Sequence, residues 1–422
     1  MPIQNRRELM KMAAAMGATL AWPAPVRAAD AGVEDRSAYP QGVASGDPTC
    51  DSILLWTRRP PTAGRKASRL TVEVAETSDF DNMVVSGSRA IDADGDHWLK
   101  GRDTGIMDEP VLRAWMQDSI PPQPSYADRP GRWVSEPCWP SPNIEDRRYT
   151  LTRHSLSDKP AEEADHHRIR LQSPLSVGMF AGKWASYAAT PDLPGDQRED
   201  DGGSLVFETE PLGDTFEVFG LPTLELDVSA DRPNAMVAAR LSDVAPNGEA
   251  TRVTYGLLNL THRDGSGDPQ PLEPGRTYHV RVPLNGMAHS FPAGHRIRLS
   301  VSSSYWPLAW PSPEPVMLTV NTGTSTLTLP HRPQRPGDDE RLRAFGPPEV
   351  APEAPATHLE PGRHHWKVER DLATGVSTLE IENDQGTILL DDVGTTVRRA
   401  TTEWFSFRGN DVDSVRGETR TV

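Results

Sequence analysis

Short runs of alternating apolar and polar residues fill the chain from about residue 204 to residue 332. In residues 224–229, leucine or valine occupies every second position and a polar side chain lies between. This period of two is typical of a strand with one buried face. Turn sequences such as Asn247-Gly248 and Pro274-Gly275 separate the runs. The pattern predicts about seven strands, at residues 217–220, 224–229, 236–241, 252–258, 278–282, 296–301 and 316–320.

The same alternation occurs near the N-terminus. Leu70, Val72 and Val74 are separated by smaller or polar residues, and about four strands are predicted before residue 96. An immunoglobulin-like sandwich needs about seven, so residues 37–96 are predicted to form a partial immunoglobulin-like β fragment. Beyond a proline-rich crossing segment at residues 331–357, further strands are expected at 366–370 and 377–381.

Composition supports a mainly β protein. The chain has 422 residues, enough for roughly two or three domains, and its 40 prolines and 33 glycines favour short strands over helical bundles. The net charge of −16 argues against a nucleic-acid partner, because no basic face is available to displace counterions from phosphates. The acidic residues are expected to keep a secreted protein soluble.

The first 28 residues have the order of an export signal. Arg6-Arg7 precedes a moderately apolar stretch at 12–22 and the small-residue site Val26-Arg27-Ala28, which predicts a twin-arginine (Tat) signal cleaved after Ala28. An amphipathic N-terminal helix is the alternative. No later run approaches the roughly 20 apolar residues that span a bilayer, so a periplasmic or extracellular protein without a membrane span is expected.

Two cysteines, Cys50 and Cys138, are present. They could pair in an oxidising compartment, although each lies in a different predicted domain. The sequence leaves this pairing open.

Three segments carry a family resemblance: SLVFETEPL at 204–212, TRVTYGLLNLTH at 251–262 and FPAGHRIRLSVSSSYW at 291–306. They resemble the C-terminal, non-catalytic domain of the CocE/NonD and X-prolyl dipeptidyl-peptidase hydrolase family. The resemblance implies a galactose-binding-like jelly-roll β-sandwich at residues 131–422. Residues 97–130 resemble the linker that joins the α/β-hydrolase domain of that family to its jelly roll.

A second resemblance precedes the first. The segments YPQGVASGDPT at 39–49 and SILLWTR at 52–58 resemble the N-terminal domain of PhoD-type alkaline phosphatases. The two resemblances together imply a fusion near Asp96 that joins two family fragments and lacks both catalytic domains. A frameshift, an assembly error or a genomic deletion would each produce such a sequence.

No catalytic residue is predicted. The G-x-S-x-G elbow that exposes the serine of an α/β-hydrolase does not occur in the sequence. His289 and His295 could form a proton-transfer pair with Asp243 or with Asp231. The family resemblance places this stretch at a turn between two strands, which favours a structural role.

No metal and no cofactor are predicted. The run Asp92-Ala-Asp94-Gly-Asp96 is similar to the start of an EF-hand loop, but His97 replaces the required glycine and Asp103 the final glutamate. Adjacent histidines at 166–167 and 364–365 would point to opposite faces of a strand. Neither pair is therefore expected to hold one metal ion, and both are expected to be exposed polar positions.

Tyr305, Trp306 and Trp310 are the predicted ligand-binding residues, because exposed rings can stack on sugars or peptides. The alternative is a remnant of the interface with a lost hydrolase domain, left as an exposed apolar patch. Three functions stay open: a non-catalytic remnant of a secreted hydrolase, a secreted carbohydrate- or peptide-binding module, and an active hydrolase with an unrecognised site. The expected partner of a remnant is a hydrolase domain or an intact homologue.

Overall fold

A computed structural model describes the backbone of four N-terminal strands and, in full, residues 109–159, 163, 166–183, 191–335, 342 and 354–422. The chain divides into two compact units, Met1–Glu109 and Pro110–Val422. The predicted Tat signal, Cys50 and the Asp92–Asp96 run lie outside the described residues.

The first unit contains two antiparallel strand pairs. Strand β1 (Val43–Gly46) pairs with β2 (Leu54–Thr57), and β3 (Ser68–Ala75) pairs with β4 (Met83–Ile91). These are the strands that the sequence predicted before residue 96.

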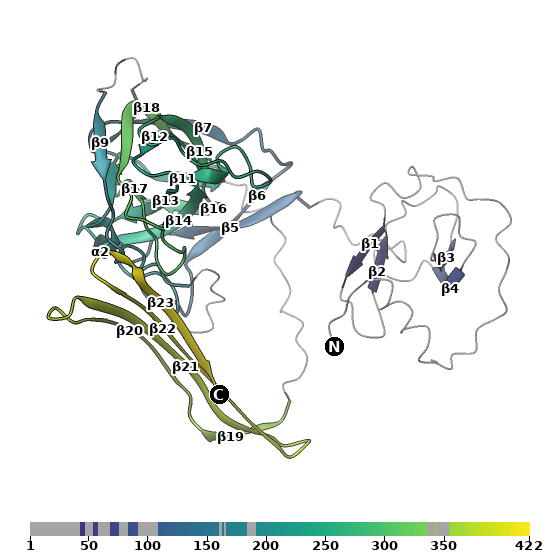
Figure 1. Cartoon of the computed structure of the whole chain (residues 1–422). Helices are drawn as coiled ribbons and strands as arrows, with labels where there is room; N and C mark the ends of the chain where they lie inside the picture. Colours follow the sequence, from purple (N-terminus) through teal and green to yellow (C-terminus); the bar gives the residue numbers. More distant parts are fainter. Residues whose placement is uncertain are drawn as a thin grey trace. The chain divides into compact units, whose positions relative to one another are not determined.

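The second unit contains a β-sandwich of two mainly antiparallel sheets (Figure 1). The larger sheet has ten strands: β5 (Leu112–Asp118), β6 (Gly131–Glu136), β7 (Glu145–Leu151), β8 (Leu156–Ser157), β9 (Arg168–Leu171), β11 (Phe216–Gly220), β12 (Thr223–Ala230), β15 (Tyr278–Pro283), β16 (Met287–Phe291) and β18 (Leu318–His331). The smaller has four: β10 (Leu205–Glu208), β17 (Arg296–Ser302), β13 (Met236–Val244) and β14 (Ala250–Asn259).

The main core lies between these sheets. Leu224, Leu226 and Val228 of β12 are fully buried, and they share one apolar cluster with Leu241 of β13 and Leu299 of β17. The alternating residues of the sequence therefore form the buried face of each sheet. Strand β13 is buried along its whole length, because other segments of the chain also cover its opposite face.

Strand β5 corrects the predicted linker at 97–130. It pairs antiparallel with β6 and parallel with β16, so residues 112–118 belong to the larger sheet. Met116 is fully buried beside Val134 and Phe219, and the indole of Trp115 donates a hydrogen bond to the Arg129 carbonyl at 3.0 Å. A single buried side chain in a short run gives too weak an alternation to reveal this strand in the sequence.

The C-terminal residues form a separate sheet. Its five antiparallel strands are β19 (Ala356–Glu360), β20 (Arg363–Arg370), β21 (Val376–Leu390), β22 (Thr395–Arg408) and β23 (Asp411–Thr421). The sandwich strands end at His331, so a jelly roll reaching residue 422 is not observed. The strands predicted at 366–370 and 377–381 are confirmed within β20 and β21. Leu379 and Phe407 pack with Trp306 and Met179, which attaches this sheet to the sandwich.

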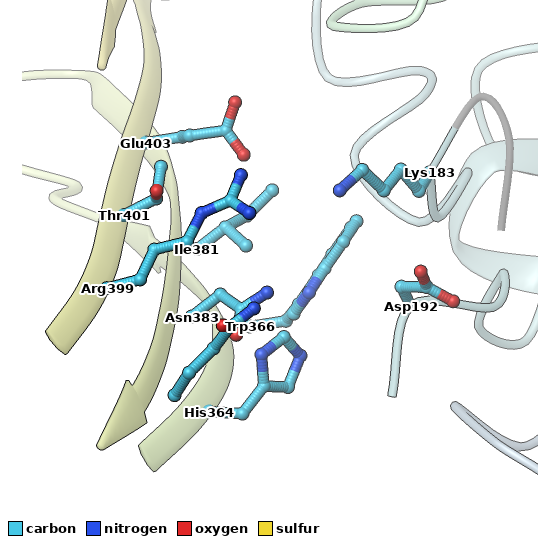
Figure 2. Close-up of a pocket in the computed structure, with 10 residues that line it drawn as sticks. Lys183, Asp192, His364, Trp366, Ile381, Asn383, Arg399, Thr401 and Glu403 are labelled. Carbon is cyan, nitrogen blue, oxygen red and sulfur yellow. The ribbon is translucent and has the colours of Figure 1, made fainter. Parts of the chain in front are cut away.

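One face of the C-terminal sheet changes from apolar to polar along its strands. Trp366, Ile381 and Glu403 form one cross-strand row. In the next row Asn383 pairs with Thr401. Figure 2 shows these side chains pointing to the same side of the sheet, toward Lys183. Among the described residues, no helix is long and apolar enough to cross a membrane.

Candidate functional site

Three of the residues considered for proton transfer converge at one end of the sandwich core. The Asp243 carboxylate accepts a hydrogen bond from His289 Nε2 at 3.0 Å and another from His295 Nδ1 at 2.7 Å. Of the two aspartates left open by the sequence, the structure therefore selects Asp243. Asp231 instead accepts a hydrogen bond from the Met317 backbone N–H at 2.9 Å.

Strand alternation brings Asp243 and His289 together. Leu241, two residues before Asp243, belongs to the core cluster, as do Met287 and Phe291 on either side of His289. Residues two apart on a strand share a face, so both polar side chains point between the sheets. His295 follows the turn that leaves β16, and the turn predicted there from the sequence is confirmed.

Burial and hydrogen bonding set the charge state of this group. Burial lowers the pKa of His289, whose side chain is 1% exposed. For Asp243 burial acts to raise the pKa, but hydrogen bonds from His289, Ser119 and His295 outweigh it and hold the pKa below its usual value. We infer a neutral His289 that donates to a charged Asp243. The second ring nitrogen of His289, Nδ1, is buried without a hydrogen-bond partner among the described residues.

A cleft of about 420 Å³ lies beside the carboxylate. Its walls include Ser119, Asp243 and His295, together with Ile120, Pro121, Ala245, Pro246, Asn247, Glu249, Thr251 and Pro292. His295 is 16% exposed, whereas His289 does not line the cleft. His295 is therefore the histidine that a molecule in the cleft would meet.

The arrangement differs from a catalytic triad. In a triad the serine hydroxyl is hydrogen-bonded to the histidine, which a carboxylate orients from the other side. Here Ser119 is hydrogen-bonded directly to Asp243. The hydrogen bond between Asp243 and His295 resembles that between the acid and the base of a triad. The nearby Ser119 hydroxyl, however, is hydrogen-bonded to the acid and not to the histidine.

The exposure expected of the aromatic platform is wrong for two of its three residues. Tyr305 is fully buried and Trp306 is 1% exposed, whereas Trp310 is 67% exposed. The ring of Trp306 contacts Trp310 and Phe405 edge to face, with centroids 4.7 and 5.7 Å apart. Because the C-terminal sheet covers Trp306, this segment does not leave a large exposed patch. Ligand binding at Trp310 stays a prediction.

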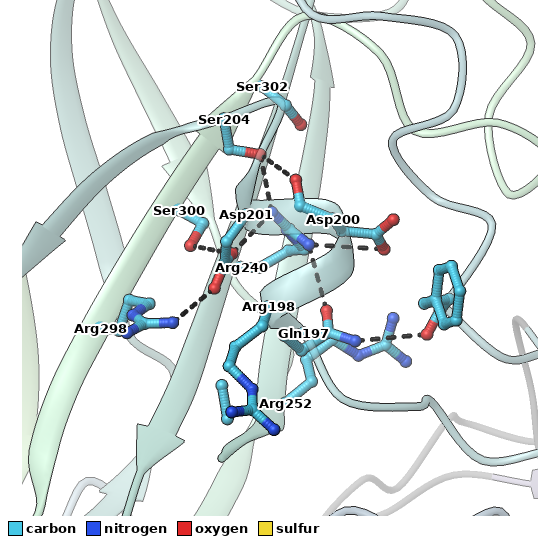
Figure 3. Close-up of polar contacts among 12 residues, drawn as sticks. Gln197, Arg198, Asp200, Asp201, Ser204, Arg240, Arg252, Arg298, Ser300 and Ser302 are labelled. Carbon is cyan, nitrogen blue, oxygen red and sulfur yellow. Dashed lines mark hydrogen bonds and ion pairs between the residues drawn. The ribbon is translucent and has the colours of Figure 1, made fainter. Parts of the chain in front are cut away.

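Figure 3 shows a buried charge network that the sequence analysis missed. Arg240 of β13 is fully buried. Its guanidinium donates to Asp201 at 3.0 Å, Ser204 at 2.7 Å and Gln197 at 3.2 Å, and lies 3.5 Å from Asp200. In the sequence, the arginine within the otherwise apolar run 236–241 could have indicated this network.

The network also attaches a short helix to the sandwich. Asp200 and Asp201 lie on helix α2 (Arg198–Asp201), and Arg298 of β17 donates to Asp201 at 2.7 Å. Burial raises the pKa of Asp200 despite the nearby charge of Arg240. Since every charged group here has an ionic partner, the network stabilises the attachment of α2 to the smaller sheet.

The remaining histidine pairs do not gather around one point. His364 contacts the Pro191 carbonyl at 3.1 Å, while its neighbour His365 contacts Glu380 at 2.9 Å. Within the described ranges, no group of three histidine, cysteine or acidic side chains is placed to hold a metal ion. Cys138 is exposed and forms no disulfide with a described residue; Cys50 lies outside the described residues, so the pairing that the sequence left open is not tested.

Two family models match the chain. The N-terminal domain of PhoD-like phosphatases matches residues 26–110, and the X-Pro dipeptidyl-peptidase C-terminal non-catalytic domain matches residues 104–369. The matches meet at 104–110, later than the junction predicted at Asp96.

Individual proteins show the same likeness. A putative serine esterase of Mycobacterium bovis is 26% identical over 233 residues, which cover 50% of this chain and 35% of the esterase. The cocaine esterase of a Rhodococcus species is 34% identical over 116 residues, covering 27% of this chain and 20% of that enzyme. A solved CocE/NonD family hydrolase from Staphylococcus aureus has 18% identity and a TM-score of 0.43, covering 56% of this chain and 44% of its own.

The chain thus matches 35% or less of the length of these two curated relatives. Because the second family model covers more than half of the sequence, this protein belongs to the X-Pro dipeptidyl-peptidase C-terminal non-catalytic domain family, and its N-terminal part matches the PhoD-like phosphatase N-terminal domain.

Proposed function

We propose that this chain is a non-catalytic accessory protein, derived from a secreted hydrolase of the CocE/NonD and X-prolyl dipeptidyl-peptidase type, and that it does not itself cleave esters or peptides. The observation that carries the proposal is the overlap of the two family matches at residues 104–110. No stretch between them is left for the alternating helices and strands of an α/β-hydrolase domain.

The chemistry at Asp243 supports the same proposal. The Ser119 hydroxyl donates a hydrogen bond to the Asp243 carboxylate, and His289 does not line the cleft. The hydroxyl is therefore hydrogen-bonded to a carboxylate and not to a histidine, whereas the nucleophilic serine of a triad is activated by a histidine.

A direct assay tests this proposal. The purified chain is incubated with p-nitrophenyl acetate and with an X-prolyl p-nitroanilide, beside a His295→Ala variant. We expect both proteins to match the buffer rate. Turnover above buffer that disappears in the variant would overturn the proposal and would identify His295 as a base.

The expected location is part of the proposal. We propose that residues 1–28 direct export by the Tat pathway, on the basis of Arg6-Arg7, the apolar stretch and the small-residue site after them. The accessory protein would then meet a hydrolase domain, or an intact homologue, outside the cytoplasm.

A second candidate function is a carbohydrate- or peptide-binding module. The exposure of Trp310, whose ring is supported edge to face by the buried Trp306, favours it. A ring held this way offers a fixed apolar surface at little entropic cost. A glycan array tests this candidate: binding that persists in Trp310→Ala would contradict a site at that ring.

A further inference from the structure

The cleft beside Asp243 has the dimensions of a small-molecule site. Its volume of about 420 Å³ lies within the range of about 300–1,000 Å³ that is typical of ligand pockets. Asp243, Glu249 and His295 lie on its wall. The same wall includes five apolar side chains, those of Ile120, Pro121, Ala245, Pro246 and Pro292. A ligand in the cleft would therefore meet both apolar surface and hydrogen-bonding groups.

The buried carboxylate of Asp243 can accept one more hydrogen bond. A carboxylate has about four lone-pair sites, and Asp243 uses three of them for His289, His295 and Ser119. Because Nδ1 of His295 donates to Asp243, Nε2 of the neutral imidazole is an acceptor. Both residues line the cleft, so each adds an acceptor to its wall.

Glu249 supplies a second carboxylate. Its Oε2 accepts a hydrogen bond from the Asn247 amide at 2.8 Å, whereas Oε1 makes no hydrogen bond or ion pair with a described residue. The side chain comes from the turn that joins β13 to β14. The cleft thus has a carboxylate from the core and another from this turn.

The charge on the wall is negative. Among the described residues that line the cleft, Asp243 and Glu249 are the two carboxylates, and there is no lysine or arginine. The arginines of neighbouring segments have other partners: Arg198 pairs with Asp196, Arg252 donates to Tyr305, and Arg296 donates to the Thr209 carbonyl. Arg129 interacts with Asp243 from outside the cleft, but it interacts with Asp118 as well. The wall therefore favours a positively charged ligand.

The acceptors favour a primary ammonium group. Such a group has three N–H donors and no acceptor, as in a lysine side chain, which matches one oxygen of Asp243, one of Glu249 and Nε2 of His295. A quaternary ammonium ion has no N–H and binds in cages of aromatic rings. No aromatic side chain lies on the described wall of the cleft, so this alternative is not favoured.

We propose that the Asp243 cleft binds a small aliphatic primary amine in its ammonium form. The ammonium group forms charge-assisted hydrogen bonds with Asp243 and Glu249 and donates to His295, while the alkyl chain packs on Ile120 and the prolines. This proposal adds a binding activity to the accessory function, at a site other than Trp310. It does not depend on the absence of hydrolase activity.

Amide NMR titration of the full chain at pH 7.5 tests the proposal with four probes: hexylammonium, 1-hexanol, methylammonium and the tripeptide glycyl-lysyl-glycine. We expect hexylammonium to bind at least tenfold more tightly than each of the others and to shift the amide signals of Ala245, Glu249 and His295. Equal affinity for 1-hexanol would overturn the role of the carboxylates, and equal affinity for methylammonium would overturn the role of the apolar wall. Tighter binding of the tripeptide would overturn the free amine in favour of a peptide lysine. Unchanged spectra with all four probes would overturn the site.

A pair of matched variants locates the binding. Glu249→Gln removes a charge from the turn and should weaken hexylammonium binding about tenfold, without changing the affinity for 1-hexanol. Glu273→Gln is the control and should bind as the unchanged protein does. It alters an exposed carboxylate at the opposite end of β13, since the N–H of the adjacent Leu272 donates to Pro233, just before that strand begins. Full affinity in Glu249→Gln, or an equal loss in both variants, would overturn the assigned site.

Discussion

The Asp243 carboxylate and the His289 imidazole are hydrogen-bonded at 3.0 Å, with each side chain 1% exposed. They lie between the two sheets at one end of an otherwise apolar core. A charge in this position is tolerated only while its hydrogen bonds are complete. The pair therefore contributes to stability rather than to chemistry.

His289→Ala should lower the free energy of unfolding by about 2–3 kcal/mol, because it removes a hydrogen bond to a buried charged group. Urea unfolding monitored by circular dichroism measures the loss. His279→Ala is the matched control, since His279 makes a similar contact with Asp227 at 2.7 Å but is 61% exposed. Equal losses in the two variants would contradict the argument from burial.

Stability should fall as the pH falls below about 6.5, the ordinary histidine pKa. Burial lowers the folded-state pKa of His289. As the pH falls, the imidazole is therefore protonated in the unfolded chain before it is protonated in the folded protein, which favours unfolding. The lowered pKa of Asp243 adds a second loss below about pH 4. Urea midpoints at pH 7.5 and 5.5 measure the first effect, and His289→Gln should reduce the difference between them. An unchanged difference in that variant would show that another group titrates.

Arg240→Met should destabilise the protein by about 3–5 kcal/mol, because Asp200 and Asp201 would be left without their buried partner. Thermal unfolding measures this. Arg276→Met removes an exposed arginine paired with Glu273 and serves as the control, with no measurable change expected. If Arg240→Met were as stable as this control, the network would not anchor α2.

Much of the sandwich could be predicted from alternation. The strands around Leu224, Met236 and Arg296 lie where the pattern placed them. In each of them, one face packs in the core between the sheets, and the other face points to solvent or to other segments of the chain. Strand β5 could not be found this way, since only Met116 among its residues is fully buried. Nor does local sequence show that the sandwich ends at His331 and that a second sheet follows.

The candidate site was predictable only in part. Two histidines and two aspartates were singled out as residue types, but the choice of Asp243 over Asp231 depends on which strand ends meet across the sandwich. The burial of Trp306 depends on Phe405 and the rest of a sheet about a hundred residues away along the chain. Pattern analysis of a short segment contains no information on such distant partners.

Trp306→Ala should cost about 3–5 kcal/mol of stability, as expected for a buried tryptophan, and should loosen the C-terminal sheet. Trp310→Ala should cost much less, because that ring is 67% exposed. Urea unfolding ranks the two variants, and limited proteolysis within residues 356–421 reports on the sheet. The reverse ranking would contradict the observed burial.

Replacing both Arg6 and Arg7 with lysine should stop export, since the Tat pathway requires the arginine pair. Cell fractionation and immunoblotting in a Tat-competent bacterium should show the precursor retained in the cytoplasm. Arg36→Lys, beyond the predicted cleavage site, is the matched control and should still be exported. Export that continues in the double variant would contradict the signal assigned to residues 1–28.

The most direct test of the accessory function is the intact mass of the purified chain after incubation with excess fluorophosphonate, with a serine esterase as positive control. A reactive serine would gain one covalent phosphonyl group, whereas a chain without an activated serine keeps its mass. We predict an unchanged mass while the control enzyme is fully labelled. Stoichiometric labelling that is lost in Ser119→Ala would contradict the non-catalytic function.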